Sequence, residues 1–153
     1  MAGFDMEFPD DLLSGLLNTP FETICEEALN EAVPILEKST KEEVKKVLEH
    51  DGDSELVNSF KAGKAKKAKN GAWIVNVSPK GYSKTHIYTA KNGKGERTKR
   101  KYPISNALKA IWKEYGIAGQ QAAKPFLGKA TRNAEKNVLD TMQKVYEKKV
   151  GAE

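Results

Sequence analysis

The chain has 153 residues, 39% of them hydrophobic, which fits one ordinary domain with a buried core and excludes wholesale disorder. No apolar run approaches the roughly 20 residues that cross a bilayer, and a single cysteine, Cys25, excludes disulfide frameworks and cysteine-based metal clusters. The net charge of +5 hides a split, because residues 1–60 carry 15 Asp/Glu against 4 Lys/Arg (−11) and residues 61–153 carry 6 against 22 (+16).

The beginning of the chain is predicted to form a short strand and a turn over residues 1–19. Phe4, Met6 and Phe8 alternate with polar residues, which is the period of a half-buried strand. This stretch lacks the positive and apolar regions of a signal peptide, so we expect a soluble protein that is made and kept in a cytoplasm.

A long amphipathic helix is predicted over residues 20–50. Pro20 takes the first helical position after a threonine cap, and apolar residues then recur with a period near 3.6. Pro34 lies inside this helix and removes one backbone hydrogen bond. We therefore expect a kink there, or a break in which Ser39 or Thr40 caps a second segment.

The middle of the chain, residues 59–102, is predicted to form two antiparallel β-hairpins. Asn70-Gly71 separates two strand-like runs and Asn92-Gly93 separates two more. An Asn-Gly pair between such runs is the strongest short-range hairpin signal, because both residues tolerate positive φ. We expect a sheet of about four strands, in which the charged last strand suits an exposed edge or a mobile arm.

Two further helices are predicted, over residues 104–115 and 125–149. The first carries apolar side chains at the spacing of a buried helix face, namely at Ile104, Ala107, Leu108, Ile111, Trp112 and Tyr115. Gly116 fits the left-handed position after a helix end, with Ile117 folding back in a Schellman arrangement, and Pro125 opens the last helix. This order of elements predicts a single α+β domain, 1–153, whose helices pack on the sheet.

No group of residues predicts catalysis or a cofactor. His50 and His86 are isolated, no metal-binding motif is present, and the acidic pairs of the first helix are adjacent in sequence and splay apart. We therefore expect a protein that is not an enzyme and that holds neither metal nor cofactor.

Lysine and arginine crowd both predicted hairpins, near tips from which long cationic side chains can reach phosphates and release counterions. These cations are Lys61, Lys64, Lys66, Lys67 and Lys69 in the first hairpin and Lys91, Lys94, Arg97, Lys99, Arg100 and Lys101 in the second. The loops hold no aromatic residues that would stack on single-stranded bases. Two interpretations stay open: solvated loops, or a small basic protein that contacts nucleic acid or an acidic protein surface without sequence preference.

Two short stretches resemble a known family. Glu114-Tyr115-Gly116, a small and polar linker, and then Pro-Phe-Leu-x-x-Ala form the first stretch, and the second is Ser54–Phe60, which has Ser-Glu in place of a Thr-Gly. The core residues of this signature are Leu56, Phe60, Trp112, Tyr115, Gly116, Pro125, Phe126, Leu127 and Ala130. Together they resemble the tail-completion, or head–tail joining, minor structural proteins of long-tailed phages and prophages.

The resemblance implies a small α+β subunit that assembles as a ring at the neck or the head-proximal end of the tail, beside other head–tail or tail proteins. It implies no reaction, no cofactor and no membrane partner, and places the protein in the host bacterial cytoplasm during assembly and then in the virion. Trp112, Tyr115, Phe126 and Leu127 are interpreted as core anchors of the signature.

Two expectations concern the contacts of such a ring. The linker residues Gly119, Gln120, Gln121 and Lys124 are candidates for subunit contact. The acidic first helix and the basic hairpins would supply complementary faces that repeat head to tail, with the basic loops near DNA in transit. The head-to-tail expectation fails if the acidic helix and the hairpins lie against each other within one chain.

Overall fold

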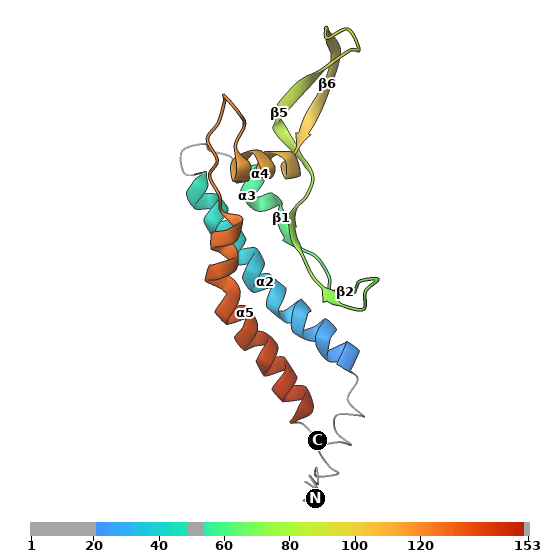
Figure 1. Ribbon diagram of the computed structural model, residues 1–153, viewed down its shortest axis with the longest axis vertical. Helices are drawn as coiled ribbons and strands as arrows, with labels where there is room; N and C mark the ends of the chain where they lie inside the picture. Colours follow the sequence, from blue (N-terminus) through green and yellow to red (C-terminus); the bar gives the residue numbers. More distant parts are fainter. Residues whose placement is uncertain (1–20, 49–53, 152–153) are drawn as a thin grey trace, which may run out of the picture.

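Two long antiparallel helices form the body of the molecule (Figure 1). The computed structural model describes residues 21–48 and 54–151. Helix α2 (Phe21–Val47) has 27 residues and α5 (Leu127–Val150) has 24, which corresponds to about 40 and 36 Å of helix. The predicted strand and turn over residues 1–19 lie outside the described residues.

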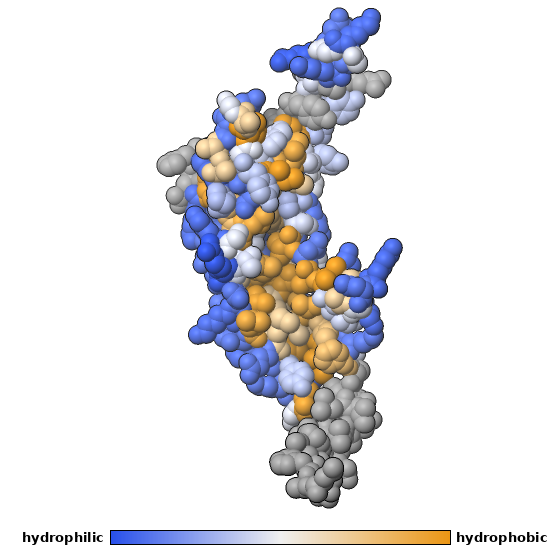
Figure 2. All heavy atoms as spheres, viewed as in Figure 1, coloured by the Kyte–Doolittle hydropathy of each residue, from blue (hydrophilic) through white to orange (hydrophobic). Residues whose placement is uncertain are grey.

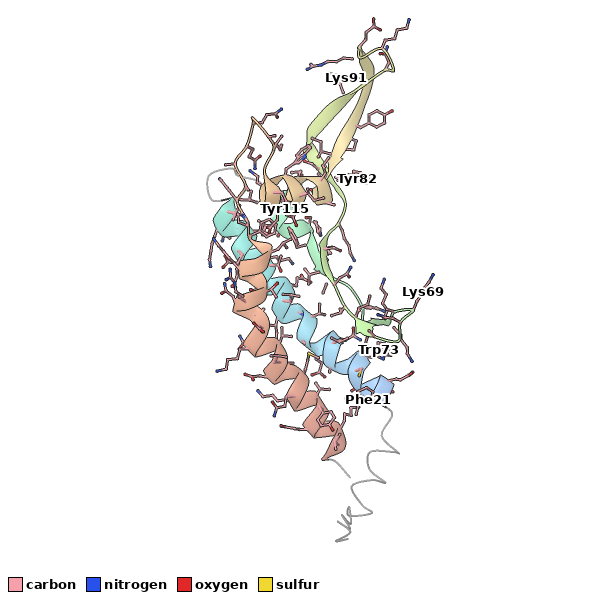
Figure 3. The ribbon with its side chains drawn as sticks, viewed as in Figure 1. Phe21, Lys69, Trp73, Tyr82, Lys91 and Tyr115 are labelled. Atoms are coloured by element: carbon pink, nitrogen blue, oxygen red, sulfur yellow. The ribbon has the colours of Figure 1, made fainter. Side chains whose placement is uncertain are left out.

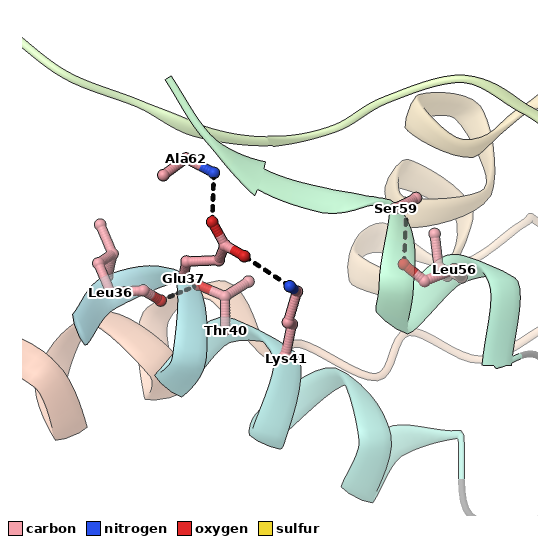
Figure 4. A network of polar contacts seen from close by, with 7 residues as sticks. All are labelled: Leu36, Glu37, Thr40, Lys41, Leu56, Ser59 and Ala62. Atoms are coloured by element: carbon pink, nitrogen blue, oxygen red, sulfur yellow. Dashed lines mark hydrogen bonds and ion pairs between the residues drawn. The ribbon is translucent and has the colours of Figure 1, made fainter. Parts of the chain in front are cut away.

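Helix α2 continues through Pro34, so the predicted break is wrong. Thr40 does not cap a new segment, because its Oγ1 donates to the Leu36 carbonyl at 2.7 Å (Figure 4). Ser39 Oγ donates to the Ala130 carbonyl of α5 at 2.8 Å. Pro34 is exposed while Val33 and other apolar residues on both sides of it are buried. Packing along the whole helix therefore outweighs the one lost hydrogen bond.

The hydrophobic core lies where the end of α2 meets the start of α5 and the elements between them. Its largest side chains cluster here, namely Val44, Leu48, Leu56, Phe60 and Phe126 together with Ala110, and smaller residues such as Ala130 and Ala134 extend the buried surface along the helix pair. The rings of Phe60 and Phe126 pack edge to face, with centroids 5.9 Å apart and planes at 89°. Leu56 comes from a short helix, α3 (Ser54–Ser59), which was not predicted.

Strands occupy the middle of the chain, as predicted. They pair as three two-stranded antiparallel ribbons: β1 (Phe60–Ala62) with β4 (Val77–Pro79), β2 (Lys66–Lys67) with β3 (Trp73–Ile74), and β5 (Tyr82–Lys91) with β6 (Arg97–Ser105). The α+β class is confirmed. The count of about four strands is approximate, because the strands of the described part form separate ribbons rather than one sheet.

Residues 60–79 form one irregular hairpin, the first hairpin, which lies against α2. Between its two ribbons the backbone of Gly63 donates to the Asn76 carbonyl at 2.8 Å. Two side chains of α2 accept hydrogen bonds from this hairpin: Glu37 from the Ala62 N–H at 2.6 Å (Figure 4) and Asn30 from the Ala65 N–H at 2.9 Å. Helix α2 thus satisfies backbone groups that a wider sheet would otherwise pair.

Residues 82–105 form the second hairpin, here called the arm, which projects away from the body (Figure 1). Its strands have the register Tyr88 opposite Tyr102 and Lys91 opposite Arg97, with irregularities in the pairing between. The arm packs mainly on itself and meets the rest of the chain near α4 (Asn106–Tyr115).

Both predicted turns are present, and both have the same geometry. In each turn, two backbone hydrogen bonds of 2.8–2.9 Å close the loop. In the first, the Ala68 N–H donates to the Ala72 carbonyl and the Gly71 N–H donates to the Ala68 carbonyl. In the second, the Asn92 N–H donates to the Glu96 carbonyl and the Gly95 N–H donates to the Asn92 carbonyl. The residue with positive φ is Gly71 (84°) in the first and Gly95 (80°) in the second. The second turn therefore depends on Gly95 and not on the glycine of its Asn-Gly pair.

Candidate interaction surface

Three features project together at one end of the molecule: α4, the linker of residues 116–126, and the base of the arm (Figure 1). We call this region the α4 end. Several residues identified in the sequence lie here, and some of those expected in the core are exposed instead.

The apolar face of α4 is exposed, so its predicted burial is wrong. Tyr115 keeps 74% of its surface, Ile111 52% and Leu108 37%, and Ala107 is exposed as well. Trp112 is half-buried. Figure 2 shows apolar side chains mixed with weakly polar ones over α4, below the hydrophilic tip of the arm, and a larger apolar area over the middle of the body. The spacing identified an apolar face correctly, but within this chain nothing that the structure describes covers it.

The opposite side of α4 is polar and buried. Asn106 and Lys109 are 5% and 7% exposed. The Asn106 side chain donates to the Lys80 carbonyl at 2.9 Å, and Lys109 Nζ donates to Ser83 Oγ at 3.3 Å. These bonds fix α4 through its polar side, which turns the apolar side outward.

One carboxylate ties the base of the arm to α3. Glu55 Oε2 accepts from Ser83 Oγ and from the Lys84 backbone N–H, both at 3.1 Å. Ser83 is only 2% exposed, and its Oγ also accepts the hydrogen bond from the Lys109 ammonium. Helices α3 and α4 therefore hold the arm by its first strand, while the rest of the arm extends beyond them.

The signature residues divide between core and surface. Leu56, Phe60, Phe126 and Ala130 are each no more than 1% exposed, which confirms them as core. Tyr115 and Leu127, at 74% and 42%, are not core anchors, and Pro125 is exposed. Successive residues of a helix point about 100° apart, so inward-facing Phe126 turns its neighbour Leu127 outward.

The linker is held by its own hydrogen bonds. The Gly116 N–H donates to the Trp112 carbonyl at 2.9 Å with φ 77°, as predicted for the residue after a helix end. The Ile117 N–H donates to the Gln121 carbonyl at 2.8 Å and not to a carbonyl of the helix, so the Schellman prediction is wrong. Gly116 has the positive φ that was expected, but its ψ of −179° is extended and not left-handed helical. A Cβ on Gly116 would lie 2.7 Å from both Gln121 O and Ala123 N.

The proposed subunit-contact residues lie on this ordered loop. Gly119, Gln120 and Lys124 are exposed and Gln121 is half-buried. The Lys124 N–H donates to the Lys113 carbonyl at 2.7 Å, which holds the last part of the linker beside α4. The loop therefore presents a fixed surface next to the exposed face of α4.

Glu114 has a structural role that was not predicted from its sequence pattern. Its Oε2 accepts from the backbone N–H groups of Phe126 and Leu127 at 2.8 and 3.1 Å. Phe126 occupies the cap position of α5 and its side chain makes no cap hydrogen bond, so Glu114 supplies the missing acceptor from another helix. The signal was present in the signature itself, where a glutamate precedes the glycine stop and a proline precedes the restart.

The structure separates the two sets of cations. Lys91 lies on the arm at one end of the molecule, whereas Lys69 lies on the first hairpin beside the body (Figure 3). In the first hairpin, Lys64, Lys66 and Lys69 are exposed and Lys67 forms an ion pair with Glu22 of α2. In the arm, Lys91, Lys94 and Arg97 are exposed; Lys99, Arg100 and Lys101 belong to β6, and their side chains lie outside the described residues.

The contacts between α2 and the first hairpin contradict part of the head-to-tail expectation. The acidic helix and that basic hairpin lie against each other within one chain, through Glu22, Glu37 and Asn30. The bond from Lys41, followed by that from the Ala62 N–H, lowers the pKa of Glu37 from its ordinary value of 4.5. Some charges of α2 and the first hairpin therefore pair with each other within one subunit and are less available for contacts between subunits.

Within residues 21–48 and 54–151, no three His, Cys, Asp or Glu side chains are grouped so that they could hold a metal ion. His50 lies outside these residues, as does the side chain of His86 in β5. None of the helices described is both long and apolar enough to cross a membrane. No protein-family model, no curated protein and no solved structure matches the chain.

Proposed function

We propose that this protein is a non-enzymatic subunit of phage or prophage virions, which acts at the head–tail junction or in tail completion and assembles with copies of itself as a ring. Its partners are then other head–tail or tail proteins, and its location is the host bacterial cytoplasm during assembly and the virion afterwards. The exposed apolar face of α4 carries this proposal.

That face has the character of an interface. Leu108, Ile111 and Tyr115 follow one another at helical spacing, and the aromatic residue is the most exposed of the three. Interface centres are enriched in aromatic and apolar residues, and a contiguous patch of this kind on a monomer marks a contact site. The ordered linker beside it extends the same surface with polar groups suited to a rim.

A second apolar face lies on α5. Leu139, Tyr146 and Val150 are 57%, 43% and 37% exposed and recur at i, i+7 and i+11 along one side of the helix. The two faces belong to different elements, and α5 runs away from the α4 end (Figure 1). Two different surfaces on one subunit are what a heterologous contact requires, and such contacts close into rings when the rotation between subunits allows it.

This arrangement replaces the charge-based contact expected from the sequence. The carboxylates of α2 are partly engaged by the first hairpin, so apolar burial, rather than pairing of an acidic helix with basic hairpins, is the proposed source of affinity. The signature joint of α4, linker and α5 then positions the contact face and takes no part in chemistry.

The test is assembly of Ile111→Glu, compared with Ile74→Glu as a control. Ile74 of β3 is also apolar and 45% exposed but lies on neither proposed face. In size-exclusion chromatography with light scattering, and in negative-stain images, we expect closed oligomers for the wild type and the control and monomers for Ile111→Glu.

Some ring subunits assemble only on the particle, so the same variants are also tested in the phage or prophage that carries the gene. Unattached heads and tails are expected with Ile111→Glu and complete virions with Ile74→Glu. Normal virions from both variants would refute the role of the α4 face, and normal virions after deletion of the gene would refute the proposed function itself.

A further inference from the structure

We infer that the tip of the arm is a contact site for the phosphate backbone of double-stranded DNA, used without sequence preference. This goes beyond assembly, because it names a second partner and assigns it to a different part of the chain. The surfaces of the ring contact are α4 and α5, whereas the tip of the arm lies away from both.

The arm concentrates positive charge. Residues 82–105 hold seven Lys/Arg against one Glu, a net charge of +6. The one acid, Glu96, is turned to the loop, where its Oε2 accepts from Asn92 Nδ2 at 2.9 Å. Among residues 21–48 and 54–151, no carboxylate forms an ion pair with Lys91, Lys94 or Arg97.

The first hairpin has similar cations but a different environment. Its residues 60–79 hold five lysines and no acid. It lies on α2, where Glu22 pairs with Lys67 and the field of Lys61 reaches Glu37. The carboxylates of α2 oppose the positive potential there, whereas the arm carries its charge away from them (Figure 1).

The shape of the arm fits a duplex. A two-stranded β-ribbon fits the major groove of B-form DNA, whereas the major groove of an RNA duplex is too deep and narrow for side chains to read. Strands of ten and nine residues extend roughly 30 Å, long enough for cations at the tip to reach phosphates while the base stays on α3 and α4.

The chemistry of the tip favours phosphates over a protein partner or single-stranded bases. Residues 89–101 contain no aromatic residue, and the loop Asn92–Glu96 is wholly polar. Protein interfaces are depleted of lysine and centred on apolar and aromatic groups. Single-strand binding relies on aromatic stacking. Lysine and arginine without aromatic neighbours suit the counterion-release mode of duplex binding.

The test is the salt dependence of binding to a fluorescent duplex of arbitrary sequence, measured by anisotropy with the full chain. One variant neutralises the arm (Lys91→Gln, Lys94→Gln, Arg97→Gln), and a matched variant neutralises the first hairpin (Lys64→Gln, Lys66→Gln, Lys69→Gln). All six side chains are exposed, so both variants keep the fold, which circular dichroism verifies. Both lose three charges, so net charge is equal between them.

We expect the arm variant to reduce the slope of log affinity against log salt by about 2.7, since each phosphate contact contributes roughly 0.9. At about 0.1 M salt its affinity falls at least tenfold, and that of the matched variant less than threefold. Equal losses in both variants would overturn the inference, as would wild type that fails to bind at about 50 mM salt. Tighter binding of duplex RNA or polyglutamate than of DNA would also overturn it.

This outcome is separable from that of the assembly test. The arm variant should form the same oligomers as the wild type and should still join heads to tails. Ile111→Glu should bind short DNA duplexes as a monomer. A loss of DNA binding with assembly intact, or the reverse, identifies which of the two proposals has failed.

Discussion

The two hairpins have the same turn, but the first packs along the body of the molecule and the arm projects from it. Each reverses the chain through a loop that ends in a left-handed glycine, Gly71 or Gly95, and each carries five or more cations. The first hairpin is packed on α2, which accepts hydrogen bonds from its backbone and pairs with Lys67. Among the described residues, the arm meets the rest of the chain mainly near its base, at α3 and α4. The local sequence therefore determines the turn, while the element on which a hairpin packs determines whether its cations are paired or free to contact a partner.

An isolated two-stranded ribbon is marginally stable in water. The first hairpin avoids this because Phe60 at its start is part of the core. The arm depends instead on polar contacts at its base, from Glu55 and Lys109 to Ser83. We expect the first hairpin to unfold with the whole molecule and the arm to open by itself, and four predictions follow from this difference.

The largest effect is expected from Phe60→Ala, compared with Tyr82→Ala at the first residue of the arm. Phe60 is 1% exposed and its ring packs on Phe126, so truncation should cost about 3–5 kcal/mol of unfolding free energy. Tyr82 is 68% exposed, and its truncation should cost no more than about 0.5 kcal/mol. Urea denaturation measures both, and similar losses would show that the arm is part of the cooperative core.

The two turn glycines provide a matched pair. Alanine at either position meets no atom within 4 Å but must adopt positive φ, at a cost of about 1–2 kcal/mol. Gly71→Ala should lower the global unfolding free energy by that amount. Gly95→Ala should leave it unchanged and accelerate amide hydrogen exchange in β5 and β6 roughly 5–30-fold. A global loss from Gly95→Ala would contradict independent opening of the arm.

Glu37→Gln weakens the anchor of the first hairpin. The carboxylate accepts from the Ala62 N–H and pairs with Lys41 at 2.5 Å, so we expect a loss of about 1 kcal/mol at neutral pH. Because folding lowers the pKa of Glu37, its contribution is complete above the ordinary value of 4.5 and is lost as the pH falls through the lowered value. Unfolding free energies of wild type and variant should therefore converge in acid, and a constant difference would contradict the assignment.

The smallest effect is expected from the surface ion pair. Lys67 and Glu22 keep 47% and 65% of their side-chain surface, so Lys67→Gln should cost no more than about 0.5 kcal/mol, less at high salt. Lys94→Gln in the arm removes no pair and should change the unfolding free energy less. Thermal denaturation at low and high salt measures both, and a salt-independent loss from Lys67→Gln would point to packing instead of charge.

The long helices and the turns could be predicted because their signals are local. Pro125 and Gly116 mark a restart and a stop in sequence, and α5 buries apolar residues at helical spacing, namely Ala130, Ala134 and Val145. Helix α3 could not be predicted in this way, because six residues with a serine at each end contain less than two turns of periodicity.

The orientation of α4 could not be predicted, because an amphipathic pattern shows which face is apolar and not what covers it. Its buried side depends on Lys109 meeting Ser83 and on Asn106 meeting the Lys80 carbonyl, 26 residues away in both cases. Such contacts exist only once the arm and α4 are placed together. The separation of the strands into ribbons has a similar origin, because Asn30 and Glu37 of α2 take backbone groups that a neighbouring strand would otherwise pair.

Glu114 gives the joint between α4 and α5 a mechanical property. It lies in the last turn of α4, one residue before exposed Tyr115, and holds the first two N–H groups at the start of α5. A displacement of α4 is therefore transmitted to the start of α5 through these two hydrogen bonds as well as through the covalent linker.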